Sequence, residues 1–297
     1  MADIRFIAFE LLSIVLFCLC LSHAFYRSNS TLSSKWYVME LISATCFGLL
    51  LEYVDTHYFD AYHYGQFALN VFSIPVCIGL LWGVIIYTSM LTSDCWGIPL
   101  LAAPFADVIQ ALNIDMGMDI VAIRIGMWNW DFIPQQYQWT AEWFGVPYGN
   151  FYGWMLVVFF FSSILRLLRI LFRNKSAGFI ATLCGFIAVI LICEVMLYLS
   201  LYYAPVYHIK PIVIGGLIFS VCLVALSMKW HHKLNIRPLI IAIAPNSIHL
   251  FFIAMLFTNI SEINTQIIVV ILFLFVCRLL VDLTFFRSAF AKKGPST

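Results

Sequence analysis

The sequence has few charged residues. Asp, Glu, Lys and Arg make up 10% of its 297 residues, whereas hydrophobic residues make up 63%. A soluble domain carries about 25% charged residues because its surface must face water. The scarcity of charge therefore excludes an ordinary soluble domain, and apolar stretches of about 20 residues, long enough to cross the hydrocarbon core, recur along the chain. We predict an all-α, polytopic transmembrane helical bundle that forms a single integral membrane domain over residues 1–297.

The sequence also lacks a strong net charge and any paired cysteine motif. The formal net charge is +1 at pH 7, so no basic or acidic excess indicates a nucleic-acid partner. Of the nine cysteines, all but Cys95 lie inside apolar segments, and no CxxC pair occurs. We interpret them as small hydrophobic residues rather than as a disulfide framework or a metal site. An apolar run follows Arg5 as in a signal peptide, but Glu10 interrupts it and no cleavage pattern follows, so we expect a retained first helix.

Apolar runs and loop charges predict eight or nine spans. We place them at residues 4–24, 36–53, 70–92, 97–113, 150–172, 178–203, 211–229, 237–258 and 265–286. Basic residues gather in four clusters, and the loops between the clusters are poor in them. Because Lys and Arg concentrate in cytoplasmic loops, the clusters should share one side of the membrane. They do so only if the short fourth span crosses, which favours nine crossings with the N-terminus outside.

Three segments are rich in polar and aromatic residues, and this topology places all three at the outer face, where they could build one site. They cover residues 52–64, 115–130 and 144–154. If a helix continues past residue 114, Asp115 and Asp119 share one of its faces because they are four residues apart. Two such carboxylates repel each other, and partial burial would raise the pKa of one, which could then act as a general acid. Two solvated loop acids are the alternative.

Several other residues permit two readings. Four residues of the first segment have side chains that can bind zinc or iron, but their spacing matches no established motif. We favour a role as polar residues that line a site or loop. They are Asp55, His57, Asp60 and His63. Glu10 and Glu194 lie inside spans, where each could be functional or form a hydrogen bond between helices. We expect structural roles for the rest: a local ion pair of Arg278 with Asp282, packing by Pro245, Asn246 and His249, and a topological role for Arg166, Arg169 and Arg173.

Each of the three segments contains a specific sequence element. Glu52 precedes F-D-A-Y-H-Y at residues 59–64, Asp115 precedes D-I-V-A at 119–122 and W-N-W at 128–130, and G-V-P-Y-G-N-F-Y-G-W covers 145–154. In order and spacing, over residues 45–165, these elements resemble the membrane-bound carotenoid biosynthesis protein family. Its members include CruF-type carotenoid hydratases and bisanhydrobacterioruberin hydratase. Ile120 stands where the family has proline and Asp60 where it has glycine, so the resemblance is to a divergent member.

The resemblance implies a hydratase that takes a hydrophobic carotenoid or polyprenyl substrate from the bilayer of a bacterial inner membrane. Such an enzyme protonates a terminal double bond and lets water capture the tertiary carbocation, which requires no redox cofactor or metal. By resemblance, Asp119 or Asp115 donates the proton, and Glu52 is its partner or the base that activates water. The expected substrate-binding residues are Tyr62, His63, Tyr64, Trp128, Trp130, Asn150 and Trp154.

Two competing hypotheses remain at this stage. If water is excluded, another double bond can capture the same carbocation, which would give a carotenoid or terpenoid cyclase or isomerase. A non-catalytic transporter or assembly protein is the third possibility. Transporters often contain repeated halves with broken helices near the midplane, whereas this sequence has no evident repeat and gathers its polar residues at one face.

Overall fold

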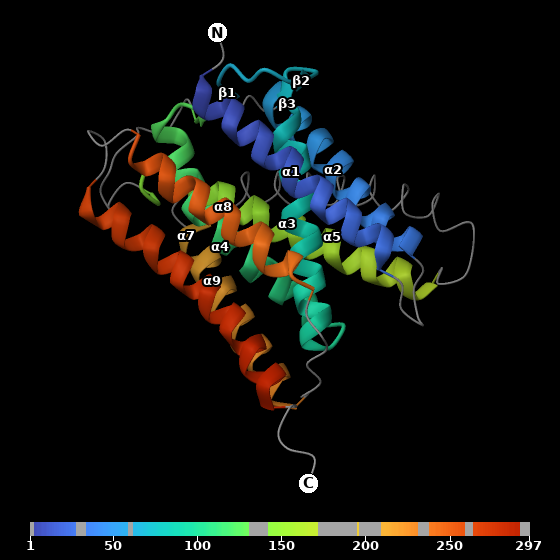
Figure 1. Ribbon diagram of the computed structural model, residues 1–297. Coiled ribbons are helices and arrows are strands. Elements are labelled where there is room, and N and C mark those ends of the chain that lie inside the picture. Colours follow the sequence, from blue (N-terminus) through green and yellow to red (C-terminus); the bar gives the residue numbers. More distant parts are fainter. Residues whose placement is uncertain are drawn as a thin grey trace.

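The computed structural model describes residues 3–27, 34–58, 62–130, 142–171, 195, 209–230, 238–258 and 264–291. The described residues form eight helices, which pack into one bundle (Figure 1). They are α1 (Ile4–Tyr26), α2 (Ser34–His57), α3 (Val76–Trp96), α4 (Ala103–Arg124), α5 (Tyr148–Leu171), α7 (Ile209–Trp230), α8 (Ile240–Leu256) and α9 (Thr265–Ala291). Six of these helices, α1, α2, α3, α5, α7 and α9, are long and apolar enough to cross a membrane. The prediction of an all-α, polytopic membrane protein is confirmed.

The structure corrects the bounds of two predicted spans. The third begins at Val76 rather than at residue 70, because residues 70–75 form a hairpin of β2 (Asn70–Val71) and β3 (Ile74–Pro75). The fourth runs from Ala103 to Arg124 rather than over 97–113, so residues 114–124, which were expected outside the membrane, are helical. The polar residues of this helix lower its mean hydropathy, so an apolar run does not mark its full length. These residues can nevertheless be buried, because they form hydrogen bonds with other parts of the protein. The predicted span at 178–203 lies outside the described residues, apart from Val195.

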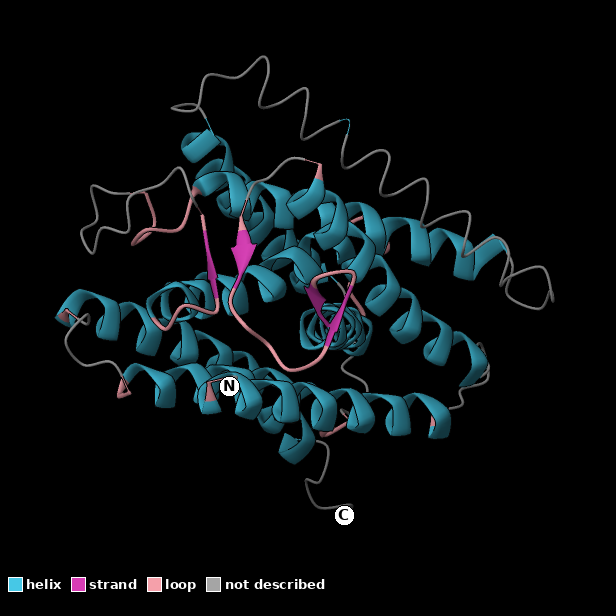
Figure 2. Ribbon diagram, turned by 90° about the horizontal axis from the view of Figure 1, so that it is seen from above, coloured by secondary structure: helices cyan, strands magenta, loops and turns pink. Residues whose placement is uncertain are grey.

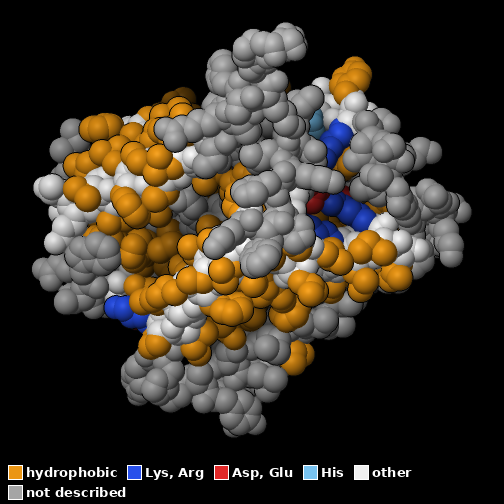
Figure 3. Space-filling view, turned by 90° about the horizontal axis from the view of Figure 1, so that it is seen from below, with side chains coloured by type: hydrophobic (Ala, Val, Ile, Leu, Met, Phe, Trp, Pro, Cys, Tyr) orange, Lys and Arg blue, Asp and Glu red, His pale blue; other side chains and the backbone are white. Residues whose placement is uncertain are grey.

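The two central helices are α3 and α4, and the others surround them. α3 contacts α1, α2, α4 and α8. Within its most apolar stretch of 18 residues, 89% of the residues are buried inside the protein. By contrast, only 17% of the residues in the most apolar stretch of α7 are buried. Both α7 and α9 carry large exposed hydrophobic side chains. Hydrophobic side chains also cover most of the described surface in Figure 3, where charged atoms occupy small areas. This exterior suits contact with lipid.

Small residues let α2 and α3 approach closely. A Cβ atom added to Gly48 would lie 2.4 Å from the Cβ of Trp82, and one added to Gly83 would lie 2.2 Å from Oγ1 of Thr45. Close approach through small residues is typical of membrane helices, whose association depends on van der Waals packing. Gly48 therefore determines how near the Trp82 side chain comes to the polar residues of α2.

A buried ion-pair cluster joins four helices at the end of the bundle away from the strands. Asp107 of α4 is fully buried and accepts hydrogen bonds from Ser93 Oγ (2.6 Å), Ser162 Oγ (2.6 Å) and Arg166 Nη1 (2.5 Å). Arg169 pairs with Glu40 of α2 and, at 2.9 Å, with Asp94 of α3. The topological role expected for Arg166 and Arg169 is therefore incomplete, because both side chains hold helices together inside the protein. Arg173 lies outside the described residues.

A second polar network connects α4 with α8 and α9. The expected ion pair of Arg278 with Asp282 is confirmed at 3.0 Å, and Asn246 Nδ2 donates to Asp282 Oδ2 at 2.6 Å. His249 Nε2 lies 3.0 Å from Asn113 Oδ1 on α4. Pro245 stands inside α8. These contacts agree with the packing role predicted for the α8 residues.

Replacement of Asp107 by Ala should lower the free energy of unfolding by about 3–5 kcal/mol, because it leaves the buried Arg166 guanidinium without its main counter-ion. Thermal unfolding in detergent, compared with the wild-type protein, measures the change. Asp3→Ala is the control: it removes a half-exposed ion pair with Arg5 and an N-cap, and should cost no more than about 1 kcal/mol. Equal effects of the two substitutions would contradict a structural role for the cluster.

Candidate functional site

Backbone pairing brings the first two polar segments together. The strand β1 (His63–Tyr64) pairs antiparallel with β4 (Trp128–Asn129), and Gly65 N donates to Met127 O at 2.9 Å. Gly126, just before β4, has φ of +75°, a conformation that favours glycine. Both strand pairs lie at the same end of the bundle (Figures 1 and 2). The short ribbon of β1 and β4 therefore carries side chains of both segments to one end of the bundle.

The third segment joins the same region through its own turn. Trp143 and Val146 form an isolated antiparallel bridge, and the indole Nε1 of Trp143 donates to the carbonyl of Met116 on α4 at 3.0 Å. The helix α5 begins at Tyr148, and Asn150 in its first turn donates hydrogen bonds to Asp115 and Asp119 in the second half of α4. All three sequence segments thus meet, as their shared position at one face had suggested.

A cavity lies where the segments meet, and its empty volume, with the open space at its mouth included, is about 430 Å³. Nine of the ten predicted site residues line it. The exception is His63, whose side chain is exposed and whose backbone pairs with Asn129. The lining residues are Glu52, Tyr62, Tyr64, Ile78, Leu81, Trp82, Ile85, Asp115, Met118, Asp119, Trp128, Trp130, Asn150 and Trp154. They include three carboxyl groups but no Lys, Arg or His, so the described walls hold no cation to balance the acids.

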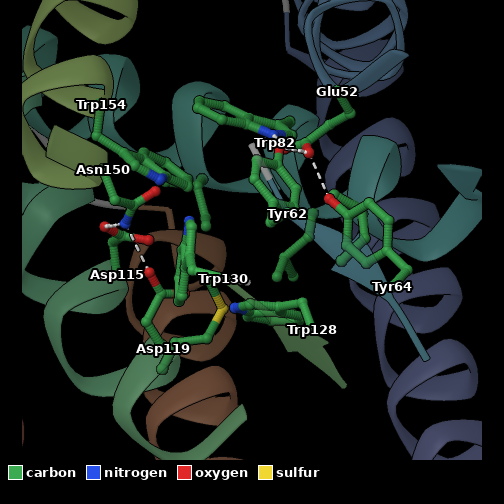
Figure 4. Close-up of a pocket in the computed structure, with 14 residues that line it drawn as sticks. Glu52, Tyr62, Tyr64, Trp82, Asp115, Asp119, Trp128, Trp130, Asn150 and Trp154 are labelled. Atoms are coloured by element: carbon green, nitrogen blue, oxygen red, sulfur yellow. Dashed lines mark hydrogen bonds between the residues drawn. The ribbon is translucent and has the colours of Figure 1, made fainter. Parts of the chain in front are cut away.

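Two buried aspartates form one polar side of the cavity. Because α4 continues to Arg124, Asp115 and Asp119 do lie on one helical face, and they are 0% and 3% exposed. The alternative of solvated loop acids is therefore wrong. The amide Nδ2 of Asn150 donates to Oδ2 of Asp119 at 2.6 Å and to Oδ2 of Asp115 at 3.2 Å (Figure 4). Among the described residues, no hydrogen-bond partner reaches the buried Oδ1 of Asp115, so this oxygen can accept or donate a bond to a bound molecule.

Glu52 forms the opposite polar side. Its Oε2 accepts hydrogen bonds from the hydroxyls of Tyr62 and Tyr64, and its Oε1 accepts one from the indole Nε1 of Trp82 at 2.7 Å. Burial, together with the nearby Glu52 carboxylate, raises the pKa of the Tyr62 and Tyr64 hydroxyls well above their ordinary value of 10. Both tyrosines therefore keep their protons and remain donors to Glu52.

Aromatic rings separate the two polar sides. Trp82 stacks on Trp154 with ring centroids 3.8 Å apart and an interplanar angle of 14°. The ring centroids of Trp130 and Tyr62 are 6.0 Å apart. Figure 4 shows Trp130 between the aspartates and Glu52. The faces of such rings carry partial negative charge, which attracts cations. The cavity is therefore an aromatic chamber with carboxyl groups at both sides.

Trp82, Met118 and the apolar residues of α3 also line this cavity, although they were not among the predicted site residues. α3 is apolar throughout its first half and contains none of the three segments. One available signal was the tryptophan itself, since a buried indole N–H needs an acceptor. Which acceptor it finds depends on the approach of α2, which the sequence does not reveal.

Other candidates lie elsewhere. Among the described residues, no three His, Cys, Asp or Glu side chains come together as metal ligands would, and Asp60 lies outside the described part. His57 stacks on Tyr53 at 4.3 Å near the exposed end of α2. Glu10 accepts a hydrogen bond from Leu69 N at 2.8 Å. This bond indicates a structural role, but it joins α1 to the loop after β1 rather than to another helix as expected. Glu194 lies outside the described residues.

Replacement of Asn150 by Ala should lower the free energy of unfolding by about 1–3 kcal/mol, because two buried carboxyl groups lose their common donor. Asn70→Ala is the matched control, since that exposed amide caps only the carbonyl of Phe67, and its effect should stay within about 0.5 kcal/mol. Thermal unfolding in detergent distinguishes the two. A neutral Asn150→Ala variant would show that the amide does not stabilise the pair.

Comparison with known proteins agrees with this arrangement. The family model described as "Carotenoid biosynthesis protein" matches residues 9–223, which include the whole cavity. No curated protein and no solved structure matches the chain. A match over residues 9–223 covers well over half of the 297 residues, and the elements that carry the earlier resemblance fall inside it. The chain therefore belongs to the carotenoid biosynthesis protein family.

Proposed function

We propose that the protein is an isoprenoid hydratase that adds water to a terminal C=C bond of a carotenoid or related polyprenyl chain. The observation that supports this most strongly is the pair of buried aspartates held by Asn150 beside an aromatic cavity. A carboxyl group in such a place is suited to protonate an alkene, and the aromatic walls are suited to a carbocation.

The reaction proceeds in two steps. The π electrons of the terminal double bond take a proton from Asp119 or Asp115, which forms a C–H bond and leaves a tertiary carbocation on the neighbouring carbon. Water then forms a C–O bond to that carbon, and the oxonium ion loses a proton to a carboxylate. The sum is the addition of one water molecule, and the enzyme returns to its starting protonation state.

The surroundings of the aspartates favour the first step. The two carboxyl groups accept hydrogen bonds from one amide nitrogen, Nδ2 of Asn150, and therefore lie close together. Two carboxylates at such close quarters repel each other, which favours a proton on one of them. Each aromatic face contributes about 0.5–2 kcal/mol of attraction for a cation, with the larger values where water is excluded. These two features supply a proton donor and a stabilised product of the proton transfer.

The cavity volume indicates which part of the substrate reacts. Its empty volume of about 430 Å³ includes the open space at its mouth, so the enclosed part is smaller still. A long polyene therefore enters with one end and leaves the rest of its chain in the bilayer. We propose that the substrate arrives from the bilayer of a bacterial inner membrane and that each binding event modifies one chain end.

The first test is expression in a bacterium that makes lycopene, followed by chromatography of the pigments with mass detection. We expect a product heavier by one water, and we expect Asp119→Asn to abolish it while the variant still unfolds at the wild-type temperature. Asp3→Asn is a control outside the cavity and should retain activity. New peaks of unchanged mass would instead indicate a cyclase or isomerase. Unaltered lycopene with folded protein would refute hydration of this substrate.

We also propose that the cavity end of the bundle faces the outside of the cell. Asn70 and Leu101 are exposed at opposite ends of α3, so a cysteine introduced at either position reports the orientation. A membrane-impermeant maleimide should label Asn70→Cys in intact cells and Leu101→Cys only after permeabilisation. The reverse pattern would place the site at the cytoplasmic face and contradict the charge-based topology.

A further inference from the structure

Glu52 differs from the aspartates in how its oxygen atoms are used. Every hydrogen bond that the structure gives Glu52 is one in which its oxygens accept, from the hydroxyls of Tyr62 and Tyr64 and from the indole N–H of Trp82. Such a set of donors suits a carboxylate, which only accepts hydrogen bonds. Asp115, by contrast, keeps a buried Oδ1 with no hydrogen-bond partner among the described residues.

From this contrast we propose that Glu52 is a fixed negative charge that stabilises the carbocation, and that Trp82 is the positioning residue that holds Glu52 in place. The inference rests on the proposed hydratase function. It assigns both proton transfers to Asp115 and Asp119. Glu52 then has no part in activating water and keeps one protonation state throughout the reaction.

The sequence of steps supports this division. When an aspartate has protonated the alkene, it becomes a carboxylate beside the reacting end of the substrate. It is then in the correct state to take the proton that the captured water releases, so no second base is required. Three of the about four lone-pair sites of the Glu52 carboxylate already accept hydrogen bonds from Tyr62, Tyr64 and Trp82. No hydrogen-bond partner among the described residues reaches Oδ1 of Asp115, so the aspartate pair is the more accessible base.

The position of Trp82 links Glu52 to the rest of the cavity wall. Its indole N–H bonds Glu52, and its ring stacks on Trp154 of α5. Gly48, one helical turn before Glu52, makes room for the Trp82 side chain, since a Cβ atom at Gly48 would lie 2.4 Å from the Cβ of Trp82. The indole and the carboxylate are therefore held together as one part of the cavity wall.

A charged group stabilises a transition state more strongly when the protein already holds it in position before the reaction. Removal of a single preorganised hydrogen-bond donor from an enzyme's charge-stabilising site typically lowers kcat by about 10²–10³-fold. We expect a loss of similar size for Glu52→Gln. The glutamine keeps the side-chain shape and one acceptor oxygen but removes the negative charge.

The experiment follows deuterium from D₂O into the hydrated product and into the recovered lycopene, with purified protein in detergent. If Glu52 stabilises the cation, Glu52→Gln forms the cation rarely, so hydration and deuterium exchange fall together by about 10²–10³-fold. If Glu52 is the base, the cation still forms and returns to alkene. Deuterated lycopene or isomers of unchanged skeleton would then accumulate while hydration is lost, and this result would overturn the proposal.

Three further variants complete the test. Glu10→Gln makes the same substitution at another buried glutamate outside the cavity, retains the acceptor for Leu69 N, and should keep wild-type activity. Glu52→Asp restores the charge and should recover part of the rate lost by Glu52→Gln. Trp82→Phe keeps an aromatic ring against Trp154 but removes the N–H, and should lower kcat with little change in KM and in the ratio of exchange to hydration.

The remaining outcomes are also decisive. Wild-type rates in Glu52→Gln would overturn the proposal, as would equal losses in Glu52→Gln and Glu52→Asp with normal thermal unfolding. A wild-type protein that neither hydrates lycopene nor exchanges deuterium would refute the proposed function itself. That failure is distinguishable from failure of the Glu52 assignment, which appears only in the variants.

Discussion

A polar group inside a membrane protein must find its partner within the protein, because hydrocarbon offers none. Helix α4 illustrates this constraint. It presents Asp107 to the ion-pair cluster, Asn113 to α8, and Asp115 and Asp119 to the cavity. Each of these groups needs a hydrogen-bond partner on another helix, and that helix must pack against α4 on the side where the group lies. The arrangement of α3, α5, α8 and α9 around α4 therefore depends in large part on the buried polar groups of α4 and their partners.

The two ends of the bundle satisfy the constraint in different ways. At the cluster around Asp107, each of the three carboxylates pairs directly with an arginine, which stabilises contacts among α2, α3, α4 and α5. At the cavity end, three carboxyl groups lie among neutral donors, and the described lining supplies no basic side chain. An excess of acid that is held in place but not neutralised is expensive in a low-dielectric interior, and such groups occur at functional sites more often than elsewhere. The end with ion pairs therefore holds together the helices that carry the unpaired carboxyl groups at the other end.

Aromatic residues perform two tasks in the cavity. Tyr62, Tyr64 and Trp82 donate hydrogen bonds that fix Glu52, while their rings and that of Trp154 form apolar walls. An aromatic side chain with a polar tip suits this combination, since one end can be hydrogen-bonded and the other can contact a hydrocarbon chain. The cavity can therefore hold carboxyl groups and an apolar substrate at the same time.

Much of the site could be predicted from the sequence, because its residues occur in three compact segments whose order and spacing are specific. The convergence of these segments at one face followed from loop charges, and the i, i+4 spacing of the aspartates predicted their shared helical face. The structural use of Arg166 and Arg169 could not be predicted, since Glu40 and Asp94, their partners, stand far away in the chain. Likewise the predicted bounds of the fourth span were wrong. A hydropathy index scores a buried, hydrogen-bonded polar residue in the same way as one that faces water.

Composition and periodic apolar runs determined by themselves that this chain is a helical membrane protein, and local motifs determined which short segments hold the polar residues. Only the tertiary structure decided which carboxyl groups share a donor, that Glu52 stands opposite the aspartates, and that Trp82 belongs to the site. The reason is physical. Hydropathy and helical spacing are properties of neighbours along the chain, whereas the partner of a buried polar group is selected by how closely two helices pack, and small residues such as Gly48 set that distance.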